Sequence, residues 1–249
     1  MKRRLESIRL SWTQVDAYRE CPLRYKYAHV LKAPAVPHHS QNYGKAVHAA
    51  IAELLRGKMR RVALSLAEVL EVFRKNWRSE GFLSREHEER RLGAGIRALE
   101  RFHAEEAASP VVPAQVEKQF SFPLGRVEVI GRFDRVDLDP AGATVIDYKT
   151  SEIEDAAAAA RRAEGSDQLR LYALAYRAQA GVLPRALELR FVETGLRGRV
   201  APEDADADRA AELVAAAEAG IRAGDFTAHP SPHTCAPCAF NRICPQADL

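Results

Sequence analysis

Hydrophobic residues recur at helical spacing in the first part of the chain. In residues 43–57 they stand three or four positions apart, which predicts a helix that ends near Gly57. Ahead of it, Ser11 followed by Gln14 forms a capping-box pattern and predicts a short helix leading to the first cysteine. Helical spacing returns over residues 65–108, where charged positions predict a solvent-facing surface. The N-terminal part is therefore expected to be helical.

From about residue 114 the pattern changes to that of strands. Valine, isoleucine and phenylalanine are frequent in residues 115–122, 126–139 and 143–150, and "DPAG" between the last two is a tight-turn signal. These segments predict a β-meander or hairpin.

Helix and strand alternate in the rest of the chain. Residues 166–181 predict a helix, residues 186–193 a strand and residues 206–223 an alanine-rich helix. The composition of residues 154–165 fits a loop or a helix equally well. This order predicts an α/β fold with a mixed central sheet flanked by helices.

Composition and charge narrow the class of protein only slightly. The chain has 249 residues, 47% of them hydrophobic, and a net charge of +3, which permits a polyanionic partner without requiring one. No apolar run approaches the length of a membrane span, and the basic N-terminus lacks the apolar stretch of a signal peptide. We expect a cytoplasmic protein with no membrane association.

Two carboxylates are expected to face each other across the predicted hairpin. If Asp139 and Gly142 close the turn, Asp134 falls opposite Asp147 with Cβ atoms about 5 Å apart, where like charges destabilise. Mg²⁺ or Mn²⁺ would offset this repulsion, because hard cations prefer oxygen ligands. Strand alternation puts Lys149 on the face of Asp147, and the three groups suit phosphodiester hydrolysis. The alternative for a D-x-K triplet is an exposed surface salt bridge.

The four cysteines suggest a metal centre. Cys21 stands alone, whereas Cys235, Cys238 and Cys244 form a C-x2-C-x5-C pattern. In a reducing compartment such cysteines are expected as metal ligands rather than disulfides. Thiolates suit iron–sulfur clusters and zinc, so residue type alone leaves both open. The one-plus-three split differs from the paired C-x2-C arrangement usual for zinc and favours a cluster.

Five motifs in order resemble the RecB-like branch of the PD-(D/E)XK nucleases. "GRFDRVD" and "VIDYKTS" resemble its motifs II and III, "YGKAVHAAI" its G-x-x-x-H helix, "QLRLY" its Q-x-x-x-Y motif, and "SWTQVDAYRECPLRYKYAHVLK" its entry segment. The resemblance implies a restriction-endonuclease-like core in one domain over 1–249. Its parts would be an N-terminal helical part over 1–110, a catalytic core over 111–200 and a C-terminal helix with cysteines over 201–249.

The resemblance also implies a set of metal ligands. These would be the side chains of His48, Asp134 and Asp147 together with the backbone carbonyl of Tyr148. Imidazole can serve a divalent cation, but a lone inward-facing histidine is also common as a core residue. For His48 both interpretations stay open at this point.

Three further residues receive roles from the resemblance. Lys149 would be the catalytic lysine, while Gln168 and Tyr172, four apart on one helix face, would line the site and place the DNA strand. Tyr172 alone would be interpreted as a core residue. Glu117 could face the same cleft from the neighbouring strand, but it is interpreted as an exposed strand residue and is left out of the site.

The expected activity and partners follow from the same resemblance. It is to iron–sulfur members of the family, the CRISPR-associated RecB-like exonucleases, and to nuclease domains attached to UvrD-type helicases. It implies a [4Fe–4S] cluster on the four cysteines, with Mg²⁺ or Mn²⁺ at the carboxylates. The substrate would be single-stranded DNA or DNA ends, in repair, recombination or CRISPR adaptation, with a helicase or a CRISPR integrase as partner. Basic clusters over 2–4, 56–61 and 170–177 could follow the phosphate backbone.

Two alternatives belong to other classes of protein. One is a non-catalytic DNA-binding scaffold or helicase accessory subunit that keeps the fold and a structural metal cluster. The other is a zinc-stapled or redox protein without nuclease activity. The pair of acids with Lys149 argues against the first, because a scaffold has no use for opposed carboxylates.

Overall fold

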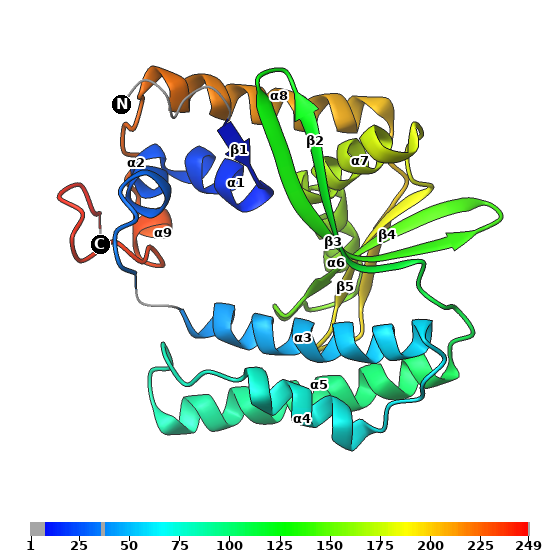
Figure 1. Cartoon of the computed structure of the whole chain (residues 1–249). Coiled ribbons are helices and arrows are strands. Elements are labelled where there is room, and N and C mark those ends of the chain that lie inside the picture. The colour runs from blue at the N-terminus through cyan, green and yellow to red at the C-terminus, as the bar shows by residue number, and fades with distance from the viewer. Residues whose placement is uncertain (1–7, 36–37, 249) are drawn as a thin grey trace.

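The structure, a computed structural model, describes residues 8–35 and 38–248 of the chain. Within that part a six-stranded sheet carries helices on both faces (Figure 1). The elements in chain order are β1 (Ile8–Leu10), α1 (Trp12–Glu20), α2 (Pro22–Tyr25), the π-helix η2 (Lys26–Val30), α3 (His39–Met59), α4 (Leu66–Asn76), α5 (Arg85–Ala108), β2 (Gln115–Leu124), β3 (Val127–Asp139), β4 (Gly142–Lys149), α6 (Ala156–Glu164), α7 (Asp167–Ala180), β5 (Ala186–Phe191), β6 (Arg197–Val200), α8 (Asp204–Ala223) and α9 (Pro232–Cys235).

The sheet is mixed, and β3 pairs with β1, β2 and β4. Its strand order is β1-β3-β4-β5-β6, with β2 paired to β3 outside this path. The pairs β1 with β3 and β4 with β5 are parallel, and the other pairs are antiparallel. The predicted α/β fold with a mixed sheet flanked by helices is confirmed.

The hairpin of β3 and β4 has the predicted register. Asp139 pairs with Gly142, and the ladder continues in step until Arg135 pairs with Ile146. The next positions of the two strands hold Asp134 and Asp147. The two acids therefore lie just beyond the last bonded pair of this hairpin.

Two layers of helices cover the sheet. Helices α3, α4 and α5 lie together on one side, and α7 and α8 lie on the other (Figure 1). The predicted helical region over 65–108 is two helices, and most of the ambiguous segment 154–165 is helix α6. The predicted stop at Gly57 is wrong: α3 continues to Met59, and Gly57 is buried because the segment with Val62 and Leu64 packs against it.

Segments from the two ends of the chain lie side by side. The hydroxyl of Tyr18 in α1 donates a hydrogen bond to the carbonyl of Asp225, at 2.7 Å, and the rings of Tyr27 and Phe240 lie 5.5 Å apart. Helices α1, α2 and α9 are neighbours in Figure 1. The predicted capping box of Ser11 at the start of α1 is confirmed. Within residues 8–35 and 38–248, no helix has the length and apolarity needed to cross a membrane.

A tightly packed glycine supports the strand that carries Asp134. A Cβ atom on Gly131 would lie 2.3 Å from the Phe120 ring, which itself packs against Phe133 and Tyr172 at centroid distances of 4.6 Å and 6.2 Å. Gly131→Ala is expected to lower the free energy of unfolding by about 1–3 kcal/mol, because overpacking displaces these rings. Denaturant titration measures this loss.

Gly93→Ala in α5 is the matched control. Its new Cβ would meet only the flexible end of Arg97, at 3.4 Å. This change is expected to leave stability equal or to raise it by up to about 1 kcal/mol, because alanine is the better helix former. Equal losses in the two variants would contradict the packing argument.

Candidate active site

The first half of the site joins α3 to the middle of β3 and the end of β4. Nδ1 of His48 lies 3.5 Å from Oδ2 of Asp134, and Nε2 of His48 lies 3.1 Å from the carbonyl oxygen of Tyr148. The Tyr148 N–H donates to the same Asp134 oxygen at 2.9 Å. The structure thus brings together the predicted side chains His48 and Asp134 and the predicted backbone carbonyl.

The charges of this group support one another. Burial alone would lower the pKa of His48, but the Asp134 carboxylate outweighs burial and raises that pKa to about 9. Burial would in turn raise the pKa of Asp134, whereas His48 and the N–H of Tyr148 lower it. An imidazolium therefore sits between a carboxylate and a carbonyl oxygen at neutral pH.

The second half of the site is a hydrogen-bonded network on β4 and α7. Nζ of Lys149 lies 2.8 Å from Oδ2 of Asp147 and donates to Oε1 of Gln168 at 2.7 Å. The Gln168 amide donates to Oδ1 of Asp147 at 2.9 Å, and the Tyr172 hydroxyl donates to the same oxygen at 3.2 Å. All four residues predicted for this part lie together. The Tyr172 ring belongs to the core, and only its hydroxyl reaches the site.

Asp147 is held in an environment that favours a cation. Its side chain is only 4% exposed, so the alternative of an exposed surface salt bridge with Lys149 is wrong. Burial raises the pKa of Asp147, the Lys149 ammonium opposes this, and the charge of Asp134 adds to the rise. The Lys149 ammonium is the close partner of Oδ2, at 2.8 Å, while Oδ1 accepts the hydrogen bonds from Gln168 and Tyr172. A cation at Oδ2 would therefore compete with this ammonium.

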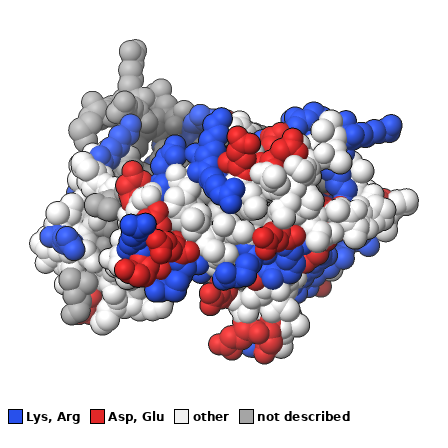
Figure 2. Space-filling model, turned by 90° about the horizontal axis from the view of Figure 1, so that it is seen from below, with Lys and Arg blue, Asp and Glu red and all other residues white. Residues whose placement is uncertain are grey.

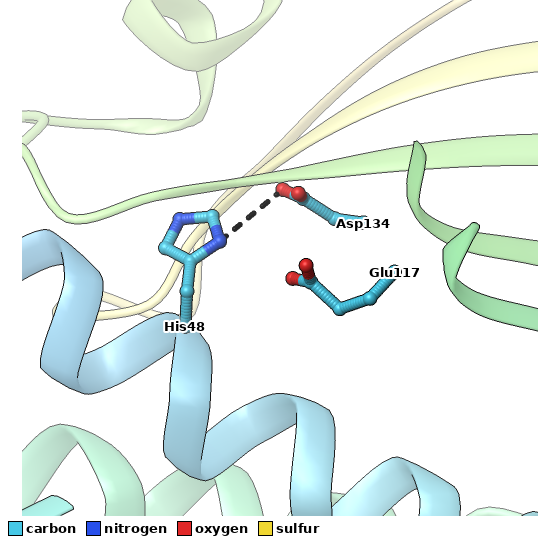
Figure 3. A group of neighbouring side chains, drawn as sticks. All are labelled: His48, Glu117 and Asp134. Carbon is cyan, nitrogen blue, oxygen red and sulfur yellow. Dashed lines mark ion pairs between the residues drawn. The ribbon is translucent and has the colours of Figure 1, made fainter. Parts of the chain in front are cut away.

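Glu117 belongs to the site, and its interpretation as an exposed strand residue is wrong. Its carboxylate, 9% exposed, points toward His48 and Asp134, and ligand atoms of the three lie within 4.8 Å of one another (Figure 3). The backbone of Glu117 has φ of 53°, a left-handed conformation rare for a non-glycine residue, in the middle of β2. It stands opposite Asp134 in the register of β2 and β3, where the ladder is interrupted.

Comparison with known proteins identifies the family. The family model of the PD-(D/E)XK nuclease superfamily matches residues 9–245. The chain belongs to the PD-(D/E)XK nuclease superfamily. Proteins of this superfamily are metal-dependent nucleases, which agrees with the acids and the lysine that the fold brings together.

One solved structure has a fold similar to that of this chain, and a second matches more weakly. A protein from Eubacterium rectale described as a "Putative exonuclease" superimposes with a TM-score of 0.55 at 11% identity, covering 99% of this chain and 92% of that chain. The crystal structure of SSO0001 matches with a TM-score of 0.39 at 14% identity, covering 91% and 96% of the two chains. No curated protein matches this chain significantly.

The donor set of this PD-(D/E)XK site fits a hard divalent cation. Ligand atoms of His48, Glu117 and Asp134 converge, and the carboxylate of Asp147 on β4 lies outside that group. Carboxylate oxygens with one imidazole suit Mg²⁺ or Mn²⁺, the ions that superfamily members use. The side chains present therefore fit the implied ion.

The four cysteines line one pocket, which joins the end of α1 to the C-terminal segment. Cys21, Cys235, Cys238 and Cys244 all border it, and none forms a disulfide. Tetrahedral zinc would hold its thiolates roughly 3.8 Å apart, given Zn–S bonds near 2.3 Å. Among the described residues no three cysteines approach within 4.8 Å of one another. A cluster spaces its thiolates more widely, because each binds a separate iron. The metal centre stays a prediction.

Binding of a cation at His48 is expected to release a proton. With a pKa of about 9, the metal-free imidazole is protonated at pH 7.5, and a metal ligand must be neutral. Calorimetric titration of Mn²⁺ in buffers of different ionisation enthalpy should report about one proton released per ion, falling toward zero above pH 9. His48→Gln should release none from this position, and an unchanged proton count in that variant would contradict the assignment.

The same protonation links stability to pH in the metal-free protein. The pKa of His48 is raised above its ordinary value of 6.5. Its contribution to the free energy of unfolding is therefore complete below pH 6.5 and disappears as the pH rises through about 9. Denaturant titrations at pH 6.5 and pH 9.5 should differ less in His48→Gln than in the wild type.

Proposed function

We propose that the protein is a divalent-metal-dependent deoxyribonuclease of the RecB-like branch, acting as an exonuclease on single-stranded DNA or DNA ends. The observation that carries this proposal is that the middle of β3, with Asp134, adjoins the end of β4, with Asp147 and Lys149, and that the lysine lies 2.8 Å from the second acid. Membership of the PD-(D/E)XK superfamily supports hydrolysis of a phosphodiester.

Each residue receives a role from its contacts. His48, Glu117, Asp134 and Asp147 would hold the cation, with the carbonyl of Tyr148, which already contacts His48. A cation bound there supplies polarisation of the phosphate and a lower pKa for a water nucleophile. Lys149 stabilises negative charge that develops on the phosphate.

Gln168 and Tyr172 act as positioning residues. The side-chain amide of Gln168 bridges Lys149 and Asp147, and the Tyr172 hydroxyl supports the same carboxylate. Fixing the ammonium relative to the acid keeps it in place for the transition state. Both residues come from α7, so this helix borders the site.

The [4Fe–4S] cluster is proposed as a structural staple. The pocket that all four cysteines line is the observation that supports it. The sequence indicates no electron acceptor, so a structural role is favoured over a redox role. A cluster there would tie the first helix to the last described segment.

A non-catalytic scaffold would be expected to have lost part of the site. This chain retains both acids, Asp134 and Asp147, together with Lys149. The wider role in repair, recombination or CRISPR adaptation, with a helicase or integrase partner, rests on the resemblance of the motifs. No P-loop pattern occurs in these 249 residues, so strand separation would have to be supplied from elsewhere.

DNA substrates of different form test the proposal. Mn²⁺-loaded protein should degrade linear single-stranded DNA to short products and leave circular single-stranded DNA intact. Blunt duplexes should be degraded more slowly. Rapid cutting of the circle would show an endonuclease instead, and failure to cut any of the three would contradict nuclease activity.

A further inference from the structure

Arg132 stands at the edge of the proposed metal site and is bound to one of its acids. It lies two residues before Asp134 on β3, so both face the same side of the strand. Nε of Arg132 is 2.5 Å from Oε2 of Glu117. The arginine side chain is 54% exposed while the glutamate is 9% exposed. The pair therefore has a buried acidic end and an open basic end.

The open end of Arg132 borders a groove. The groove has a volume of about 570 Å³ and runs between α3 and the β2–β3 hairpin, with His48 and Glu117 in its wall. Lys45 and Arg56 of α3 line it as well, about 16 Å apart along the helix. Arg132 also borders a second hollow, next to Arg9. A polyanionic strand passing the metal site along this groove would meet three cations.

Other basic regions make poorer tracks. Of the predicted cluster over 56–61, Lys58 is bound to Glu106 and the carbonyl of Ser109, and Arg60 pairs with Glu53. On the face formed by α4 and α5, acidic and basic side chains are mixed (Figure 2). Lys58 and Arg60 are thus engaged with acids in this structure, and the expectation of a backbone track over 56–61 stays a prediction. The predicted basic cluster over 2–4 lies outside the described residues.

Glu117 has two competing positive partners. Its carboxylate is bound to Arg132 and is also within the group of ligand atoms that would surround a cation. A divalent cation would attract this carboxylate more strongly than a half-exposed guanidinium does, and it would repel the guanidinium. The arginine would then lack its anion while standing in the groove, where a phosphate offers a bidentate replacement.

We propose that Arg132 binds a phosphate of the DNA strand and that cation binding releases it from Glu117 for this purpose. The inference rests on the proposed nuclease function, because it uses the same cation site. Cation and DNA then bind cooperatively, since the cation takes the acid and the phosphate takes the arginine. By linkage, DNA also raises the affinity of the site for the cation.

DNA affinity tests the phosphate contact. All variants carry Lys149→Ala to keep the DNA intact, and a labelled single-stranded oligonucleotide is titrated by fluorescence anisotropy with Mn²⁺ or with EDTA. Arg132→Ala should weaken binding roughly tenfold in Mn²⁺. It should also lower the slope of log affinity against log salt by about one, in Mn²⁺ only. Glu117→Gln should tighten binding in EDTA, and much less so when Arg132→Ala is also present.

Cation affinity without DNA supplies the second measurement. Arg132→Ala should bind Mn²⁺ roughly three- to tenfold more tightly, because Glu117 no longer has a competing partner. Arg185→Ala is the matched control, since Arg185 forms a similar exposed pair with Asp139, at 2.6 Å, at the tip of the β3–β4 hairpin. The control should change neither affinity beyond about twofold.

The outcomes separate this inference from the nuclease proposal. If Arg132→Ala matches Arg185→Ala in both titrations, or weakens Mn²⁺ binding, the exchange of partners is wrong even when the wild type cleaves DNA. If the wild type cleaves no DNA, the nuclease proposal fails, while the two titrations still report on Arg132.

Discussion

Lys149→Ala is expected to slow cleavage of single-stranded DNA by roughly 10²- to 10⁴-fold, the range for loss of one charge-stabilising or proton-handling group. The Lys149 ammonium contacts Asp147 and Gln168 directly. No other described lysine or arginine has an ion pair with Asp147. Removing it takes away the positive charge beside the acid but leaves the metal ligands. Single-turnover cleavage of an end-labelled strand measures the effect.

Two further measurements separate catalysis from folding. Mn²⁺ affinity should be retained in Lys149→Ala, because the lysine competes with the cation rather than binding it, and the thermal transition should remain cooperative. Lys75→Ala, at an exposed position of α4, is the matched control and should cleave at the wild-type rate. A rate within threefold of wild type in Lys149→Ala would remove the lysine from the reaction.

Cys235→Ala is expected to produce the largest loss of stability. A cluster held by Cys21 and Cys235 closes a loop of more than two hundred residues, and closure of so long a loop contributes about 5 kcal/mol. The variant should lose its iron and visible absorption, and its melting temperature should fall by roughly 10–20 °C. Anaerobic purification, metal analysis and thermal melting measure these changes.

A neighbouring residue provides the control for the cysteine. Thr234→Val changes the lining of the same pocket without removing a thiol. It should retain iron and shift the melting temperature by only a few degrees, because only the hydrogen bond with Ser231 is lost. Unchanged absorption and melting temperature in Cys235→Ala would contradict the staple, and zinc without iron in the wild type would favour the other metal.

The sequence predicted the hairpin that carries Asp134 and Asp147, because turn chemistry sets strand register. The "DPAG" turn placed Asp139 against Gly142, and from there Asp134 against Asp147. Strand alternation alone then placed Lys149 on the same face of the strand as Asp147. Site residues on one hairpin are therefore readable from local rules.

Glu117 was left out of the predicted site, although the same counting of strand register applies to it. β2 and β3 meet around Gly125, whose φ of 59° fits a tight turn, and Leu124 pairs with Val127. Counting back from that pair puts Glu117 opposite Asp134. The signal was present, but the left-handed backbone that turns the side chain into the site is set by tertiary packing.

Other parts of the fold depend on contacts that no local pattern carries. The three residues of the short strand β1 carry no strand pattern of their own. The strand forms because it pairs with β3. Glycine commonly ends a helix, yet at Gly57 a neighbouring segment packs against the residue and the helix continues to Met59. His48 and Tyr148 are 100 positions apart in the sequence, so only the family resemblance predicted that they lie together.

Cation-dependent cleavage by wild type and Asp134→Asn tests the central claim most directly. Asp134→Asn keeps the shape of the side chain but removes the charge that faces His48 and receives the Tyr148 N–H. After removal of metal by EDTA, wild type should cut linear single-stranded DNA only when Mn²⁺ or Mg²⁺ is restored, and the variant should bind Mn²⁺ weakly and cut no DNA. Cleavage by wild type in EDTA, or equal cleavage by the folded variant, would contradict a metal-dependent nuclease at this site.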